Sequence, residues 1–270
     1  MKRNKLISIL LAGATVLCAG AALLCNAKVE SIETEYQAAE ETYADIAKSY
    51  APSLLAEGKT DGADSTEGKA EEEQTVTVLT VDFEGLNAQC PFGSAAGWLI
   101  CEGTHINYPV MQCDDNNYYL HRLSDGTYNF SGSLYTDFRC AENFTGTNTI
   151  IYGHNMASGA MFGELSRYIN DGTYFEEHPD MTLITPNGNY KAEVFSAFVT
   201  VTGNEKIWQT EFESDEDYGE YLNWLKQESR IPSGPNVPVT PDDKIVTLIT
   251  CAAGSDSSRT LVLAKLTEIS

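Results

Sequence analysis

IVTLITCAAGSDSSRTLVLAKL, residues 245–266, has the pattern of two strands separated by a turn. The runs 245–250 and 260–266 are rich in Val, Ile, Leu and Thr, the composition of buried strands. The intervening AAGSDSS favours a turn, because Gly, Ser and Asp are turn residues. If the two runs pair antiparallel, Cys251 ends one strand where Arg259 begins the other. Directly opposed residues have Cβ atoms ~5 Å apart, so the pattern predicts a thiol beside a permanent cation.

A positive charge next to Cys251 has a chemical consequence. It favours the thiolate over the thiol, and the thiolate is the nucleophile of cysteine enzymes. The hairpin therefore makes Cys251 a candidate nucleophile. The alternative interpretation is that Cys251 is an ordinary buried cysteine and Arg259 a solvated strand end.

A nucleophilic cysteine also needs a proton acceptor, usually a histidine that folding brings near. Of the four histidines, His105, His121 and His178 lie among polar neighbours, which favours solvated surface positions. His154 differs because it directly follows the strand-like run TNTIIYG, and rigid scaffolds place catalytic groups at strand ends. Gly153 lets the backbone turn there without a side-chain clash. His154 is therefore the candidate base.

The overall composition excludes some classes of function. The chain has 270 residues, of which 42% are hydrophobic, so it can build a real core. Its 17 Lys and Arg stand against 39 Asp and Glu, a net charge of −22 that argues against a nucleic-acid partner. Neither CxxC nor HExxH spacing occurs, so we expect no metal site and no cofactor.

The N-terminus has the pattern of a membrane segment. Basic residues at positions 2, 3 and 5 precede the run 6–24, which has no charged residue. At 1.5 Å per residue this run is just long enough to cross a hydrocarbon layer of ~30 Å, and the basic flank keeps the N-terminal end in the cytoplasm. Two interpretations compete: an uncleaved signal anchor, or a signal peptide cut after Ala27. Either one exports residues 28–270.

Export bears on the cysteines that follow this segment. An odd number in an exported domain leaves at least one unpaired within the chain. The pattern is compatible with reduced thiols throughout or with up to two bridges among the first four. The five cysteines are Cys90, Cys101, Cys113, Cys140 and Cys251.

The chain between the anchor and the C-terminal half changes character twice. Residues 31–50 carry apolar positions at helical spacing and predict a helix that packs on the domain or serves as a stalk. Residues 56–74 are acidic, with almost no aliphatic residue, and predict a linker. The resulting division is an anchor at 1–27, an extracellular helix or stalk and acidic linker at 28–74, and a catalytic domain at 75–270.

Short strands dominate the rest of the chain. A helix is predicted over 158–171, with Ser158 as its N-cap, and another over 214–230 with acids in its first turn. Mostly strands with peripheral helices predict a closed or nearly closed β-barrel. The further predicted strands are TVTVLTVDF (75–83), AGWLIC (96–101), NYPVMQ (107–112), TIIYG (149–153), MTLIT (181–185) and YKAEVFSAFVTV (190–201).

These residues together resemble a known family. IIYGHNM, then MFGEL, then TLITC with an arginine eight residues later, are similar to the motifs of the sortases, cysteine transpeptidases of Gram-positive surfaces. Further stretches resemble class B in particular: VDFEGL, GWLICEGTHINYPVMQCDDNNYYL, SGSLYTDFR and the insertion at 212–230. The resemblance runs in the family's order from about Val81 to the C-terminus.

The resemblance implies a fold and a set of roles. The fold would be the closed eight-stranded sortase barrel, with an N-terminal helix and a further helix in the loop before the catalytic strand. Cys251 would be the nucleophile, His154 the general acid and base, and Arg259 the group that binds substrate and stabilises the oxyanion. The residues that would line the substrate groove are Asn116, Leu120 and Tyr152.

The same resemblance implies partners and a location. The donor would be the sorting signal of another exported surface protein, cut after a threonine, and the acceptor a peptidoglycan-precursor amine. It also favours an uncleaved anchor at 6–24, which places the catalytic domain outside a single-pass membrane segment.

Two other functions fit parts of the pattern. An exported cysteine peptidase would use the same groups but transfer its acyl-enzyme to water. A surface adhesion barrel would use Cys251 structurally.

Overall fold

The structure is a computed structural model that describes residues 2–55, 79–252 and 254–269. It has two compact units, Met1–Thr42 and Tyr43–Ser270. Helix α1 (Lys2–Tyr50) makes up the first unit from Lys2 and contributes its last turns to the second. A search of the described residues finds no helix with a stretch both apolar and long enough to span a membrane. The predicted linker at 56–74 lies outside the described residues.

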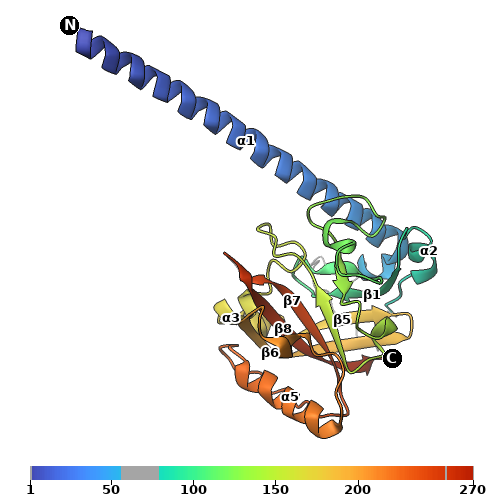
Figure 1. The fold of residues 1–270 in the computed structure, drawn as a ribbon. Helices are drawn as coiled ribbons and strands as arrows, with labels where there is room; N and C mark the ends of the chain where they lie inside the picture. The colour runs from blue at the N-terminus through green and yellow to red at the C-terminus, as the bar shows by residue number, and fades with distance from the viewer. Residues whose placement is uncertain (1, 56–78, 253, 270) are drawn as a thin grey trace, which may run out of the picture. The chain divides into compact units, whose positions relative to one another are not determined.

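The second unit is a closed barrel of eight strands (Figure 1). Around the barrel the order is β1-β2-β3-β4-β7-β8-β6-β5, and β5 pairs with β1 to close it. The closed eight-stranded barrel predicted from the family resemblance is confirmed. The strands are β1 (Ser94–Ile100), β2 (Asn107–Gln112), β3 (Leu134–Thr136), β4 (Asn148–Tyr152), β5 (Asp180–Thr185), β6 (Gly188–Val201), β7 (Lys244–Ala252) and β8 (Ser255–Ile269).

One pair of neighbouring strands decides where the site lies. β4 and β7 run parallel, in register from Asn148 opposite Ile245 to Tyr152 opposite Ile249. Both strands are almost continuously apolar or threonine-rich and are buried until their last residues, as expected for parallel strands covered on both faces. Their carboxyl ends therefore meet at the same rim of the barrel.

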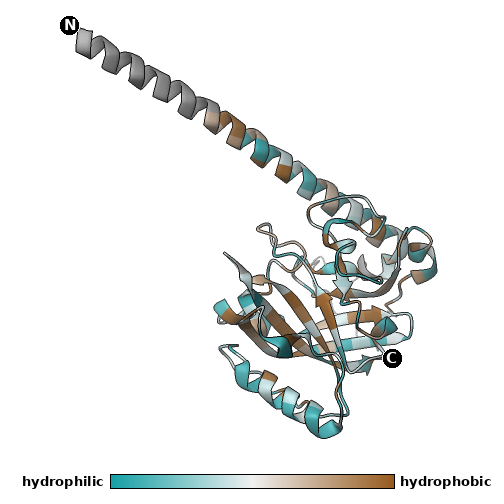
Figure 2. Ribbon diagram, in the orientation of Figure 1, coloured by the Kyte–Doolittle hydropathy of each residue, from teal (hydrophilic) through white to brown (hydrophobic). Residues whose placement is uncertain are grey.

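Helix α5 (Asp215–Glu228) covers one side of the barrel. Ser214 caps it by accepting a hydrogen bond from the Asp217 backbone N–H at 3.2 Å, and acids fill its first turn, as the helix dipole favours. Figure 2 shows hydrophobic residues concentrated on the strands and a mostly hydrophilic outer surface on α5. The side chains that α5 buries in one core cluster with strand residues are Tyr218, Tyr221, Leu222 and Leu225.

The other helical segments are short. They are α2 (Phe83–Asn87), α3 (Arg167–Asn170), α4 (Tyr174–Glu177) and the single turns η1 (Pro52–Leu55), η2 (Tyr119–His121), η3 (Glu142–Phe144) and η4 (Glu205–Trp208).

The helix predicted over 158–171 was wrong in extent. Only α3 is helical, because Gly159 and Met161 have φ angles of +91° and +53°, which no right-handed helix accepts. The apolar positions still face the core, with Phe162 and Leu165 fully buried. The helical spacing of these residues thus predicted correctly which side chains are buried, but it predicted the wrong backbone conformation.

The strand predicted over 75–83 was also wrong where it can be judged. Positions 75–78 lie outside the described residues, and Phe83 begins α2. The Asp82 carboxylate accepts a hydrogen bond from the Gly85 backbone N–H at 2.9 Å, which starts the helix. The cap outweighs the β-propensity of the apolar run before it.

Six cysteines of the described part of the chain are free thiols: Cys25, Cys90, Cys101, Cys113, Cys140 and Cys251. Of the two possibilities for the barrel cysteines, the structure has the reduced one. Cys251 is exposed, whereas Cys101, Cys113 and Cys140 are buried.

Candidate active site

The β7–β8 hairpin brings the first two predicted residues together. Cys251 lies directly opposite Arg259 in the antiparallel register, which confirms the pairing predicted from sequence. Residues 245–250 of β7 are buried, and the strand becomes exposed at Cys251. The Arg259 guanidinium donates a hydrogen bond from Nη1 to the Ser258 carbonyl at 3.0 Å. An exposed thiol thus stands beside a half-buried cation.

The parallel β4–β7 pair brings His154 to the same place. The ladder ends with Tyr152 opposite Ile249. Beyond it, the Gly153 N–H donates to the Ile249 carbonyl at 3.2 Å, and the Asn155 side-chain amide donates to the Cys251 carbonyl at 2.8 Å. His154 lies between these two contacts, so its backbone passes beside the end of β7 that carries Cys251.

Gly153 is required there by packing. A Cβ at this position would lie 2.5 Å from Leu134 Cδ2 and 2.7 Å from Phe162 Cδ2. Both neighbours are fully buried and have no room to move. The glycine therefore allows the backbone that carries His154 to approach the core closely.

The imidazole of His154 is half-buried and tied to one backbone group. Its Nε2 lies 2.7 Å from the Leu120 carbonyl oxygen. Burial lowers the pKa of His154 below its ordinary value, the Leu120 hydrogen bond opposes this, and the charge of His121 adds to the lowering. At neutral pH the ring is therefore mostly uncharged and can accept a proton.

His121 is a correction to the sequence analysis, which placed it on the solvated surface. Its ring is half-buried and lies nearly parallel to that of His154, with centroids 5.3 Å apart and planes 18° apart. The two histidines are far apart in the chain, so the polar neighbours of His121 gave no signal of this contact.

A buried carboxylate organises the predicted groove. Asp137 has no exposed surface and holds Arg139 through two hydrogen bonds, both 2.8 Å. The Tyr152 hydroxyl donates to Asp137 at 2.6 Å, and the Asn116 amide donates to it at 3.1 Å. Asn116 Oδ1 in turn accepts the Phe138 N–H at 3.0 Å. Asn116 and Tyr152 are thus fixed by one carboxylate that sequence analysis had not singled out.

The charge state of Asp137 follows from these contacts. Burial alone would raise its pKa, but hydrogen bonds from Arg139 and Tyr152 outweigh burial and hold the pKa at about 2. The carboxylate is therefore ionised across the whole physiological range. The motif SGSLYTDFR contains both Asp137 and Arg139, but only the fold connects them to Asn116 and Tyr152.

Replacing Asp137 with Asn should destabilise the protein by about 2 kcal/mol at neutral pH, because Tyr152 loses its acceptor and Arg139 its counter-ion. The Arg139 guanidinium is half-exposed and stays hydrated in the variant, which limits the loss of stability. The folded pKa lies below the unfolded value of ~3.9. The stabilisation is therefore present above pH ~4 and disappears as the pH falls through about 2.

Urea unfolding of both proteins at several pH values between 2 and 7 measures this difference. The difference in the free energy of unfolding between wild type and Asp137→Asn should become smaller towards pH 2. Asp242→Asn, at an exposed position, is the matched control and should show almost no gap. If this difference in the free energy of unfolding did not depend on pH, the ionised carboxylate would not be the source of the stabilisation.

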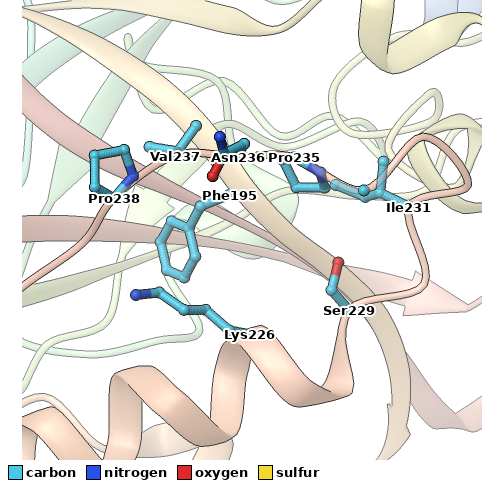
Figure 3. A pocket seen from close by; sticks show the side chains of 9 residues that line it. Phe195, Lys226, Ser229, Ile231, Pro235, Asn236, Val237 and Pro238 are labelled. Atoms are coloured by element: carbon cyan, nitrogen blue, oxygen red, sulfur yellow. The ribbon is translucent and has the colours of Figure 1, made fainter.

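One cavity of the described part of the chain lies away from these residues. It has a volume of about 430 Å³ and separates the end of α5 from the following segment, with Phe195, Lys226 and Ser229 among its lining (Figure 3). None of its lining residues belongs to the candidate site. Within the described ranges, no group of three or more His, Cys, Asp or Glu side chains is placed to hold a metal ion.

The structure thus divides the predicted residues into two adjoining sets. Cys251 and Arg259 are opposed at the rim where β4 and β7 end, His154 follows β4 at the same rim, and the Leu120 carbonyl contacts the His154 ring. Asn116 meets Tyr152, the last residue of β4, on Asp137. A thiol, an imidazole and a guanidinium at one rim are suited to acyl transfer through a thioester.

Comparisons with a family model, with curated relatives and with solved structures all identify the same family. A family model described as the sortase domain matches residues 100–267. Sortase B of Listeria monocytogenes is 38% identical over 172 residues, which cover 63% of this chain and 68% of the relative. A solved Staphylococcus aureus sortase B–substrate complex is 35% identical and covers 70% of this chain and 86% of that one, with a TM-score of 0.64. A solved sortase B complexed with triglycine is 34% identical, with coverage of 70% and 86% and a TM-score of 0.64.

Proposed function

Because this chain belongs to the sortase family of cysteine transpeptidases, we propose that Cys251 is its nucleophile, His154 its general acid and base, and Arg259 its oxyanion-binding cation. The observation that carries this proposal is the placement of the three groups. Arg259 is opposed to Cys251 across an antiparallel ladder, and His154 follows the strand that runs parallel beside it.

The first half-reaction cleaves the donor peptide. The neutral His154 ring takes the proton of the Cys251 thiol, and the resulting thiolate attacks the scissile carbonyl carbon to form a tetrahedral oxyanion. The carbon–nitrogen bond then breaks, and the His154 imidazolium gives its proton to the departing amine. The acyl group remains on sulfur as a thioester, and the imidazole is left neutral.

The second half-reaction forms the new amide. An incoming amine attacks the thioester carbonyl, His154 takes a proton from that amine, and the carbon–sulfur bond breaks. His154 then returns the proton to the Cys251 thiolate. Arg259 donates hydrogen bonds to the oxyanion in both halves, because a guanidinium keeps its protons at any working pH. No proton is gained or lost by the enzyme over the cycle.

The substrates proposed are those of class B sortases. The donor is the sorting signal of an exported surface protein, cut after a threonine, and the acceptor is a peptidoglycan-precursor amine. The described S. aureus relative is a substrate complex and another relative is complexed with triglycine, which supports a peptide donor and a short peptide amine. Asn116, Leu120 and Tyr152 are the proposed groove residues.

The location proposed is the outer face of the cell membrane. Sortases are cell-surface enzymes of Gram-positive bacteria, and the uncharged run 6–24 behind a basic flank supports an uncleaved single-pass anchor. The proposed division is then an anchor at 1–27, a stalk and linker at 28–74 and a catalytic domain at 75–270.

The decisive experiment is a peptide-library digest followed by an acceptor competition. The protein is incubated with peptides that contain proline and threonine, and acyl-enzyme masses identify the donor and the cleaved bond. Triglycine is then added, and a sortase should yield amide product at the expense of the free acid. Acid alone at every triglycine concentration would instead make the protein a hydrolase, and cleavage at another residue would overturn the threonine assignment.

Arg259→Lys should lower kcat/KM by about 10²-fold although the positive charge is retained. The ammonium is a point charge and does not reproduce the planar fork of donors. Steady-state kinetics with the best library peptide measures the loss. Lys265→Arg, on the same strand, is the matched control and should stay near wild type. Equal activity in Arg259→Lys would reduce the role of Arg259 to that of a general positive charge.

A further inference from the structure

The imidazole of His154 can work as proposed only if some group holds it in place. A carbonyl oxygen can only accept a hydrogen bond, so the nitrogen 2.7 Å from Leu120 O must be the donor. Nε2 therefore carries a hydrogen in both the neutral and the charged ring. In the neutral ring the lone pair is on Nδ1, which is the only nitrogen left to take a proton.

The Leu120 carbonyl is itself held firmly. On one side the Tyr119 carbonyl accepts the Ser133 N–H at 3.0 Å, and on the other the His121 carbonyl accepts the Asn129 N–H at 3.1 Å. These two bonds bracket Leu120 and leave its oxygen to His154.

Gly132 presses directly against the same carbonyl. It has a φ of +58°, and a Cβ there would lie 2.4 Å from Leu120 O and 2.7 Å from Tyr119 O. The Tyr43 hydroxyl donates to the Gly132 carbonyl at 2.8 Å, so this close approach is fixed from the other side as well. A side chain at position 132 would displace the acceptor that His154 uses.

Two further rings fix the plane of the imidazole. Phe130 lies 5.7 Å from His154 and 5.8 Å from His121, with interplanar angles of 18° and 21°. With the 5.3 Å between the two histidines, the centroids form a nearly equilateral triangle. If the three rings were stacked in a single column, the centroids of the two outer rings would lie about twice as far apart as those of neighbouring rings. The three centroid distances are nearly equal instead, so each ring contacts both others.

His121 contributes through its ring. Its Nδ1 is buried and makes no hydrogen bond within the described residues, so no hydrogen bond of this atom accounts for the position of the ring. The His121 ring contacts the rings of His154 and Phe130, and also that of Tyr128.

We propose that the 120–132 segment is the orienting element of the catalytic histidine. The Leu120 carbonyl fixes the Nε2–H tautomer, the His121 and Phe130 rings fix the plane, and Nδ1 exchanges the proton with substrate. A backbone carbonyl thus takes the part that a side-chain carboxylate plays in other catalytic triads. The inference rests on the proposed role of His154, and these three residues are positioning residues.

The first test reads the tautomer directly. Protein labelled with ¹⁵N-histidine is studied by long-range ¹⁵N–¹H correlation at a pH where His154 is neutral, and His154→Ala identifies its signals. The Nε2–H pattern is expected in the wild type. A predominant Nδ1–H pattern would overturn the proposal. This readout needs no activity, so it stays informative even if His154→Ala proves active and the catalytic assignment itself fails.

The second test perturbs the orienting groups. Gly132→Ala should give mixed tautomers and a fall in kcat of roughly tenfold, with KM for the donor peptide changed by less than about twofold. Phe130→Ala, at a position 46% exposed, should fold normally and lose kcat in the same way. His121→Ala should lose kcat, and His121→Phe should recover most of it because the ring is restored.

A control in the same segment separates orientation from general disturbance. Tyr128 is 67% exposed, and its ring contacts His121 without reaching His154. Tyr128→Ala should keep both the kcat and the Nε2–H pattern. Folded Gly132→Ala and Phe130→Ala proteins that keep the wild-type kcat would refute the orienting role.

Discussion

Replacing Cys251 with alanine should abolish transpeptidation, a loss on the order of 10⁴-fold or more. A methyl group cannot attack a carbonyl, and the proposed reaction has no route around the thioester. The barrel should stay folded, because Cys251 is exposed and makes no disulfide. The measurements are amide product by liquid chromatography, acyl-enzyme by intact mass, and the thermal midpoint.

Cys90→Ala is the matched control for this experiment. Cys90 is also a free thiol, but burial raises its pKa to about 11, so it is protonated at working pH and a poor nucleophile. Its replacement should leave activity near wild type. Persistent amide formation by Cys251→Ala would refute the covalent mechanism whatever the control does.

His154→Ala should lower kcat/KM by about 10²- to 10⁴-fold. Without the imidazole, the departing amine has no proton donor and the incoming amine no base. The lowered pKa of His154 makes the neutral ring abundant at pH 7, so the variant should be most impaired in the second, amine-dependent half-reaction. Single-turnover acylation and triglycine-dependent release of the thioester, measured separately, give the two losses.

His105→Ala is the control for a lost histidine. His105 is half-exposed and lies 3.5 Å from Glu164, an ion pair only when the ring is charged. An exposed pair of this kind is worth little, so activity and stability should stay near wild type. Equal losses in His105→Ala and His154→Ala would show that the assay reports general damage and not catalysis.

The parts of the structure that could be predicted from the sequence are those that depend on residues close together in the chain. The Cys251–Arg259 pair followed from two branched runs around a turn, and α5 from a serine cap with acids behind it. The position of His154 followed from a strand end. In each case the residues that decide the conformation are close together in the chain.

Apart from the strand wrongly predicted over 75–83, which a local cap decides, the misses have the opposite property. Segment 158–166 has helical spacing, but tertiary packing holds Gly159 and Met161 at positive φ. Nothing near Asp137 in the sequence announces that Asn116 and Tyr152 converge on it. His121 looked solvated because the His154 ring that stacks on it comes from another part of the fold.

The parallel β4–β7 pair has a consequence for how such an enzyme tolerates change. The proposed nucleophile, Cys251, lies on β7, and the proposed base, His154, follows β4, the adjacent strand of a closed barrel that has no free edge where a strand can slip. If the proposed roles are right, the topology of the barrel sets the distance between the His154 backbone and that of Cys251. Insertions and substitutions in the surrounding loops can diversify what the groove accepts while the proton-transfer geometry stays the same.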